Sequence, residues 1–138
     1  MRPNRSVEVR RFHRVALQRF EDSEILLDGG RNTGAIYLAG YAVECALKAI
    51  PLSATPLSQI PDLAKSFRGG RGHDLEWLKE QYLRAGRPGF PPALARNFAR
   101  VNSWKTDIRY KPGPSLVRDA EEFIGAVGLI LGWVEELL

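Results

Sequence analysis

The chain has 138 residues and a net charge of +4, a size that suits one domain with its own hydrophobic core. No apolar run approaches the roughly 18 residues of a membrane span, and the basic N-terminal start has no apolar segment of a secretory signal behind it. One cysteine excludes an internal disulfide and, with only two histidines, cannot assemble a zinc site. We therefore expect a single cytoplasmic domain over residues 1–138, with no metal and no membrane contact.

The first two elements are predicted to form a helical hairpin. Apolar residues recur at three- and four-residue steps over 9–28, and the glycines of Asp28-Gly29-Gly30 end that helix. Asn32 is the predicted N-cap of the second helix, which runs to Ile50 and is stopped by Pro51. Such a short break between helices favours an antiparallel pair.

Residues 51–72 contain three Pro, three Gly and three Ser, and this composition predicts a long loop with one turn of helix around 62–67. Loops of this length are uncommon inside compact domains and are often functional. A short third helix follows, with Asp74 as its cap, and extends to about Ala85.

The C-terminal part of the chain predicts two more helices. The fourth begins at the pair Pro91-Pro92 and covers residues 92–104, followed by a connector over 105–114. Ser115 is the predicted cap of a last helix with a continuous apolar stripe that runs to the C-terminus. Since no segment alternates like a strand, we predict an all-α fold, an up-down bundle of four to five helices.

Basic charge gathers in two parts of the sequence. Residues 1–19 hold six Arg and one Glu, and residues 65–111 hold eleven basic and four acidic residues, whereas the other stretches are net acidic. Arg, with its planar guanidinium, suits bidentate phosphate contacts. This distribution is compatible with an anionic partner such as RNA or a nucleotide, and equally with a solvated surface rich in Arg.

The second helix carries one polar stripe among small apolar residues. Tyr37, Tyr41, Glu44 and Lys48 stand at offsets that place them on one side of the helix. The small residues beside them let other helices approach closely, which predicts a central position for this helix. The stripe either borders a groove or dimer seam, or presents Glu44 to a pocket where it orients an Arg from elsewhere.

Three sequence pieces, in order, resemble one known family. YLAGYAVECALKA in the second helix, GHDLEWL at 72–78 and IRY at 108–110 are similar to motifs of the HEPN domain (higher eukaryotes and prokaryotes nucleotide-binding domain). The closing GWVEEL is also typical, so the resemblance covers about residues 9–138. It implies a HEPN-like bundle of four or five helices, often a homodimer, with a role near nucleotides or RNA. We expect no cofactor.

The resemblance implies two alternative activities. Family members commonly pair with small nucleotidyltransferases as toxin–antitoxin systems, while others are toxins that cut RNA without a metal. Those ribonucleases use an Arg followed, after four to six residues, by a His, contributed by both subunits across a dimer cleft. Here the one formal match is Arg68 with His73, which precedes the third helix, whereas the family motif lies toward the final helices. Arg68 and His73 are therefore weak catalytic candidates.

The remaining candidates for nucleotide or RNA binding are Arg109, Tyr110 and Lys111 in the connector, with Glu44 and Lys48 on the second helix. Arg109 can clamp a phosphate and Tyr110 can stack on a base. Alternatively, Arg109 pairs with Glu44 and only fixes the connector. Three functions stay open: a dimeric RNA or nucleotide module paired with a nucleotidyltransferase, a metal-independent endoribonuclease toxin, and a structural helical dimer without a nucleic-acid role.

Overall fold

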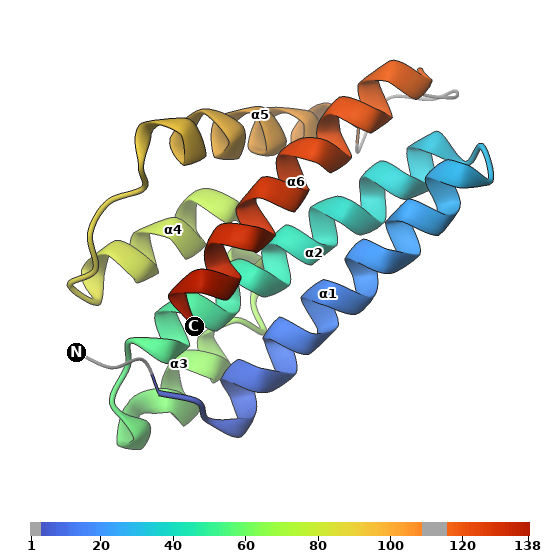
Figure 1. Cartoon of the computed structure of the whole chain (residues 1–138). Coiled ribbons are helices and arrows are strands. Elements are labelled where there is room, and N and C mark those ends of the chain that lie inside the picture. The colour runs from blue at the N-terminus through green and yellow to red at the C-terminus, as the bar shows by residue number, and fades with distance from the viewer. Residues whose placement is uncertain (1–3, 109–115) are drawn as a thin grey trace.

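The computed structural model describes residues 4–108 and 116–138, with only the backbone described for 104–108. It contains the helices α1 (Val7–Asp28), α2 (Asn32–Ser53), α3 (Ile60–Ser66), α4 (Leu75–Arg84), α5 (Pro92–Ile108) and α6 (Val117–Leu137), with two short 3-10 turns, η1 (Leu57–Gln59) and η2 (Gly70–His73). The described residues include no strand, so the predicted all-α class is confirmed (Figure 1).

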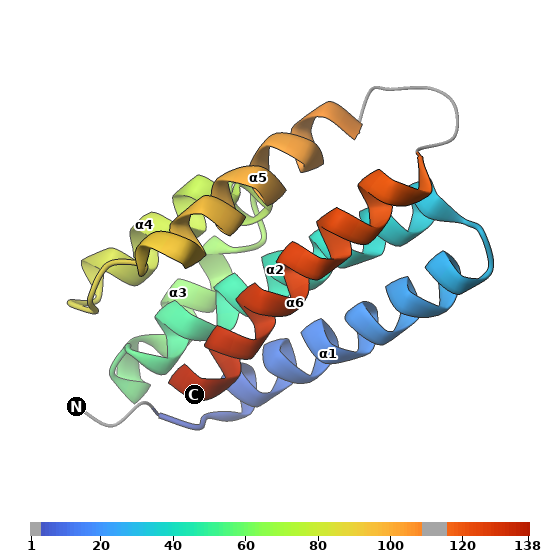
Figure 2. The ribbon, with the colours of Figure 1, turned by 45° about the horizontal axis from the view of Figure 1, so that its top comes forward.

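Helix α2 lies at the centre of the bundle and packs against α1, α6, α4 and α5 (Figures 1 and 2). Every residue from Ala42 to Ser53 is buried, so this half of the helix is covered on all sides. Small residues such as Ala39, Gly40 and Ala46 keep its surface narrow and let its neighbours approach. The predicted central position is confirmed.

Among the described residues, α2 is also the one helix that is long and apolar enough to cross a membrane. However, 83% of its most apolar window is buried inside the bundle. A core helix surrounded by other helices needs the same apolar composition, because it too has no contact with water. Packing within the protein therefore accounts for the hydropathy of α2.

The α1–α2 hairpin forms as the sequence predicts. Helix α1 ends at Asp28, and Gly30 turns the chain with a φ of 77°, in the left-handed region that glycine enters at little cost. Asn32 is the first residue of α2 rather than its N-cap, since Arg31 occupies the cap position. The two helices then run antiparallel along their whole length (Figure 2).

The predicted stop at Pro51 is wrong, because Pro51 lies inside the last turn of α2, which continues to Ser53. Proline lacks the backbone N–H that would donate to a carbonyl one turn earlier. Near the C-terminal end of a helix the carbonyls already lack helical donors, and side chains can donate hydrogen bonds to them instead. Ser53 Oγ donates to Ile50 O at 2.7 Å, and Asn4 Nδ2, from the start of the chain, donates to Leu52 O at 2.7 Å. With these contacts the helix ends at Ser53, three residues later than the expected Ile50.

The predicted long loop over 51–72 is also wrong, since most of it is helical. The end of α2, η1, α3 and η2 occupy this segment in turn. Pro61 stands in the first turn of α3, where its missing N–H costs nothing. Ile60 and Phe67, at the two ends of α3, are both buried, so the segment is held by the core that it covers. The expected helical turn around 62–67 is part of α3.

Two boundaries in the C-terminal part differ from the prediction. Helix α5 continues to Ile108, so the first four residues of the expected connector, 105–108, are helical. Helix α6 begins at Val117 with Leu116 in the cap position, while the predicted cap, Ser115, lies outside the described residues. The cap of α4 is confirmed, because Asp74 Oδ1 accepts hydrogen bonds from the backbone of Glu76 and Trp77 at 3.0 and 3.2 Å.

Candidate functional site

Three titratable side chains meet where α2 passes the η2 turn. Lys48 Nζ lies 3.1 Å from Glu44 Oε2, one helical turn away on α2. His73 Nδ1, at the end of η2, lies 3.2 Å from Glu44 Oε2 and 3.3 Å from Glu44 Oε1. The side chains of Glu44 and Lys48 are 3% and 10% exposed, whereas that of His73 is 60% exposed. The cluster therefore joins a buried carboxylate to an imidazole at the surface.

The sequence Gly72-His73-Asp74 explains how the imidazole reaches this place. Gly72 is buried, and a Cβ atom there would overlap the carbonyl oxygen of Phe67, so only glycine permits this close approach. Asp74 then caps α4 and fixes the direction in which that helix leaves. His73 stands between these two constraints, which hold its backbone beside Glu44.

The buried carboxylate of Glu44 needs its partners, because an unpaired charge in a protein interior is strongly disfavoured. An ionised carboxylate only accepts hydrogen bonds, so both Lys48 Nζ and His73 Nδ1 act as donors in these contacts. Lys48 Nζ also lies 5.8 Å from the ring centroid of Phe12, a cation–π distance. The Phe12 ring packs edge-on against Phe67, which closes the apolar side of the cluster.

The predicted polar stripe of α2 divides into an exposed and a buried half. Tyr37 and Tyr41 are 52% and 43% exposed, whereas Glu44 and Lys48 lie inside. The charge of the Cys45 thiolate, followed by burial, raises the pKa of Tyr41 above its ordinary value. Burial is the main cause that raises the pKa of the Cys45 thiol above its ordinary value, so this thiol ionises less readily than an exposed cysteine. Only the buried half of the stripe contributes to the cluster.

The other predicted site residues are placed differently. Arg68 is exposed on the segment between α3 and η2, and none of the side-chain hydrogen bonds or ion pairs between described residues joins it to His73. Arg109, Tyr110 and Lys111 lie outside the described residues, so the expected pairing of Glu44 with Arg109 stays a prediction. Two partners of Glu44 that the structure does place are Lys48, its neighbour on the same polar stripe, and His73, which the sequence did not suggest.

Sequence reasoning missed Phe12, Phe67 and Gly72 as parts of the site. The two phenylalanines look like ordinary core residues in the sequence, and nothing in their spacing connects them to Lys48. Gly72 did carry a signal, because a glycine directly before a histidine and a helix cap indicates a tight backbone approach. The identity of the atom approached, the Phe67 carbonyl oxygen, required the fold.

The arrangement has two chemical capacities. An imidazole whose Nδ1 is fixed by a carboxylate can exchange protons through Nε2, and a positive group at the surface can bind a phosphate. The exposed Arg71 lies within the η2 turn that carries His73, and the exposed Arg68 stands two residues before this turn, so both add positive charge near the imidazole. No group of three or more His, Cys, Asp or Glu side chains suited to a metal ion occurs within the described ranges.

Comparison with known proteins gives one match. The family model described as HEPN domain matches residues 9–137, nearly the whole chain. No curated protein and no solved structure matches the chain. The matched range includes α2, the η2 turn and α4, and thus all three members of the Glu44–Lys48–His73 cluster.

Proposed function

The chain belongs to the HEPN domain family, and we propose that it acts as a homodimeric RNA- or nucleotide-binding module paired with a small nucleotidyltransferase. HEPN domains form a family of modules related to nucleotides and RNA, so the family match supports a role of this general kind. The pairing with a nucleotidyltransferase, the toxin–antitoxin role and the dimer go beyond the family match and belong to this proposal. Within it, the cluster of Glu44, Lys48 and His73 with the adjacent arginines is the binding site.

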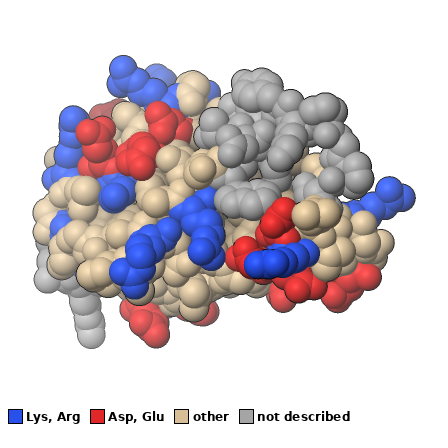
Figure 3. Space-filling model, turned by 90° about the horizontal axis from the view of Figure 1, so that it is seen from above, with Lys and Arg blue, Asp and Glu red and all other residues tan. Residues whose placement is uncertain are grey.

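One observation carries the proposal: a buried carboxylate holds an exposed imidazole on a turn that contains one exposed arginine and follows a second one closely. Arg68, Arg71 and His73 occur within six residues of sequence, so a single phosphate group can meet more than one of them. On the face seen in Figure 3, groups of Lys and Arg side chains lie beside groups of Asp and Glu. On this face the charges are mixed, which favours a local site over a broad basic surface there.

The test measures how the affinity for a labelled single-stranded RNA depends on salt. If arginines neutralise phosphates, the affinity falls steeply between about 50 and 200 mM salt, because binding releases counterions. The double variant Arg68→Glu/Arg71→Glu is expected to bind at least tenfold more weakly. Arg118→Glu is the matched control, since Arg118 is 86% exposed on α6 and pairs with Glu122. An RNA affinity that does not change with salt concentration, or no RNA binding at all, would favour the structural helical dimer.

A metal-independent endoribonuclease is the second candidate, and the Glu44–His73 contact favours it. In that reaction His73 Nε2 removes the proton of a ribose 2′-hydroxyl, and the 2′-oxygen attacks the adjacent phosphorus. The bond from phosphorus to the 5′-oxygen breaks, leaving a 2′,3′-cyclic phosphate, and the 5′-oxygen takes a proton back from the imidazolium. Glu44 holds the imidazole in the tautomer that presents Nε2, and Arg68 binds the phosphate.

Cleavage of RNA in EDTA distinguishes the enzyme from the binding module. If the chain is a ribonuclease, His73→Ala and Arg68→Ala each abolish most cleavage, and Glu44→Gln lowers it while RNA affinity changes little. Cleavage that survives in both alanine variants removes this site from the reaction. If the wild-type chain does not cleave RNA, the enzyme reading fails and the binding module is unaffected.

The dimer and the partner need separate experiments. Exposed apolar side chains on two helices support a seam: Tyr37 and Tyr41 on α2, and Val117 and Leu129 on α6. Sedimentation velocity at micromolar concentration is expected to show a dimer, and a monomer there contradicts the proposal. A nucleotidyltransferase encoded beside this chain is expected to copurify with it when the two are expressed together.

A further inference from the structure

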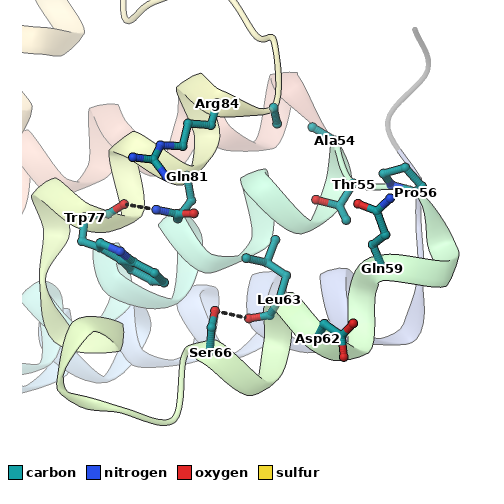
Figure 4. A pocket seen from close by; sticks show the side chains of 11 residues that line it. Ala54, Thr55, Pro56, Gln59, Asp62, Leu63, Ser66, Trp77, Gln81 and Arg84 are labelled. Carbon is teal, nitrogen blue, oxygen red and sulfur yellow. Dashed lines mark hydrogen bonds between the residues drawn. The ribbon is translucent and has the colours of Figure 1, made fainter.

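A groove of about 740 Å³ lies between α4 and the segment formed by the end of α2, η1 and α3 (Figure 4). Three elements contribute to its walls: Trp77, Gln81 and Arg84 stand on α4, Asp62, Leu63 and Ser66 on α3, and Thr55, Pro56 and Gln59 between α2 and α3. None of the residues of the Glu44–Lys48–His73 cluster lines this groove. It is therefore a second feature of the surface, separate from the site proposed above.

The groove has opposite charges on its two sides. Arg84 rises from α4 on one side and Asp62 from α3 on the other, as Figure 4 shows. Among the ion pairs of the described residues, neither Asp62 nor Arg84 takes part in one. Both side chains are exposed, so each is able to meet a charge brought by a bound molecule. The groove is thus suited to a ligand that carries both a positive and a negative group.

Amide groups and an apolar floor lie between these charges. Gln59 and Gln81 each offer a carboxamide, which has a donor and an acceptor like the peptide group itself. Among hydrogen bonds between described residues, Gln81 Nε2 makes one, a long 3.5 Å contact with Trp77 O. Leu63 and Trp77 supply apolar surface, and the Trp77 ring is braced edge-on by Phe67 at a centroid distance of 6.1 Å. A fixed aromatic ring is a typical anchor point for an apolar side chain.

We propose that this groove binds an extended peptide segment of a partner protein, in which one apolar residue lies between a basic and an acidic residue. The apolar side chain packs on Trp77 and Leu63, the basic residue pairs with Asp62 and the acidic residue pairs with Arg84. The carboxamide of Gln81 or Gln59 hydrogen-bonds the backbone of the segment. The proposal is independent of RNA binding, because Arg68, Arg71 and His73 are not among the lining residues.

Charge complementarity favours a peptide over a nucleic acid at this place. The affinity of a single strand of RNA comes largely from cations that neutralise successive phosphates. The groove provides one guanidinium, and its carboxylate repels the next phosphate along the strand. A dipolar peptide, by contrast, satisfies both groups at once.

A charge-swap experiment tests the proposal. The probes are fluorescein-labelled synthetic pentapeptides with a central Leu or Phe flanked by one Glu and one Lys, in both orders, and a control peptide with Gln at both flanking positions. Fluorescence polarisation is expected to show at least one dipolar peptide that binds at least tenfold more tightly than the control. Arg84→Glu and Asp62→Lys each lower that affinity tenfold, and the double variant restores binding to the peptide of opposite order.

A matched control keeps the result specific. Arg87→Glu changes the same charge three residues beyond Arg84, outside the groove lining, and is expected to leave peptide affinity unchanged. The proposal is overturned if no dipolar peptide exceeds the control, or if the charge reversals leave peptide binding as it was. It is also overturned if Arg84→Glu abolishes RNA binding instead, or if it converts a dimer to a monomer, since either result assigns the groove to another occupant.

Discussion

The ion pair of Glu44 and Lys48 offers a quantitative prediction about the stability of the fold. Lys48→Met removes the ammonium group but keeps a side chain of similar length in the same apolar surroundings. The carboxylate of Glu44, 3% exposed, then loses the donor that lies 3.1 Å from its Oε2. Its contact with His73 Nδ1 involves a side chain that is 60% exposed, so water competes for the imidazole.

The size of the effect follows from the geometry. Two unit charges 3.1 Å apart interact by about 5 kcal/mol at the effective dielectric of about 20 that suits protein sites. Breaking a buried pair by removing one partner costs about 3–5 kcal/mol. Because His73 still donates to the carboxylate, we expect the lower end, about 3 kcal/mol. In the double variant Glu44→Leu/Lys48→Met both charges of this pair are removed together, so we expect a cost smaller than that of Lys48→Met alone.

Urea denaturation followed by circular dichroism measures these free energies of unfolding, and an unchanged m-value shows that the variants unfold in the same way. Glu44→Leu completes the double-mutant cycle, which isolates the energy of the pair itself. The reasoning is refuted if Lys48→Met costs less than about 1 kcal/mol, the range of exposed ion pairs. The reasoning is also refuted if the change in the free energy of unfolding in the double variant equals the sum of the changes in the two single variants.

Further predictions concern the turn that carries the imidazole and the buried thiol. Gly72→Ala is expected to lower stability and weaken RNA binding together, because its Cβ would overlap Phe67 O and push His73 away from Glu44; normal binding in a stable variant would contradict this. Asp74→Ala removes the cap of α4 and should cost about 0.5–2 kcal/mol in urea denaturation. Burial raises the pKa of Cys45 above its ordinary 9.0, so the folded chain keeps a proton that the unfolded chain loses. Stability should therefore fall as pH rises above about 9, less steeply in Cys45→Ala, and equal slopes would count against the burial of the thiol.

Local patterns in the sequence determined the helices and the first hairpin. Apolar spacing predicts α1 and α2, the glycines of Asp28-Gly29-Gly30 predict the turn between them, and Asp74 predicts the start of α4. Each of these signals depends on residues that lie within about one helical turn of one another, so they act in the same way in any surroundings. The motifs in α2 and at 72–78 likewise pointed to the family that the matched range confirms.

Tertiary contacts decided the parts that sequence reasoning placed wrongly or left open. Residues 51–72 have the composition of a loop, but burial of Ile60 and Phe67 against the core and the reach of Asn4 to the end of α2 make most of the segment helical. Propensity is a weak preference, and burial of two large side chains outweighs it.

The partner of Glu44 was likewise decided by the fold. The sequence placed Glu44 on a polar stripe of α2 and suggested an Arg from the connector as its partner. In the structure, His73 contacts Glu44, although the two residues are 29 positions apart in the sequence. No periodicity links positions that far apart. Whether they meet depends on how α3 and η2 pack across α2, and on one glycine, Gly72, that lets the backbone pass close enough to Phe67. The chemistry of each residue can be read in the sequence, but which residues act together is fixed only when the helices pack.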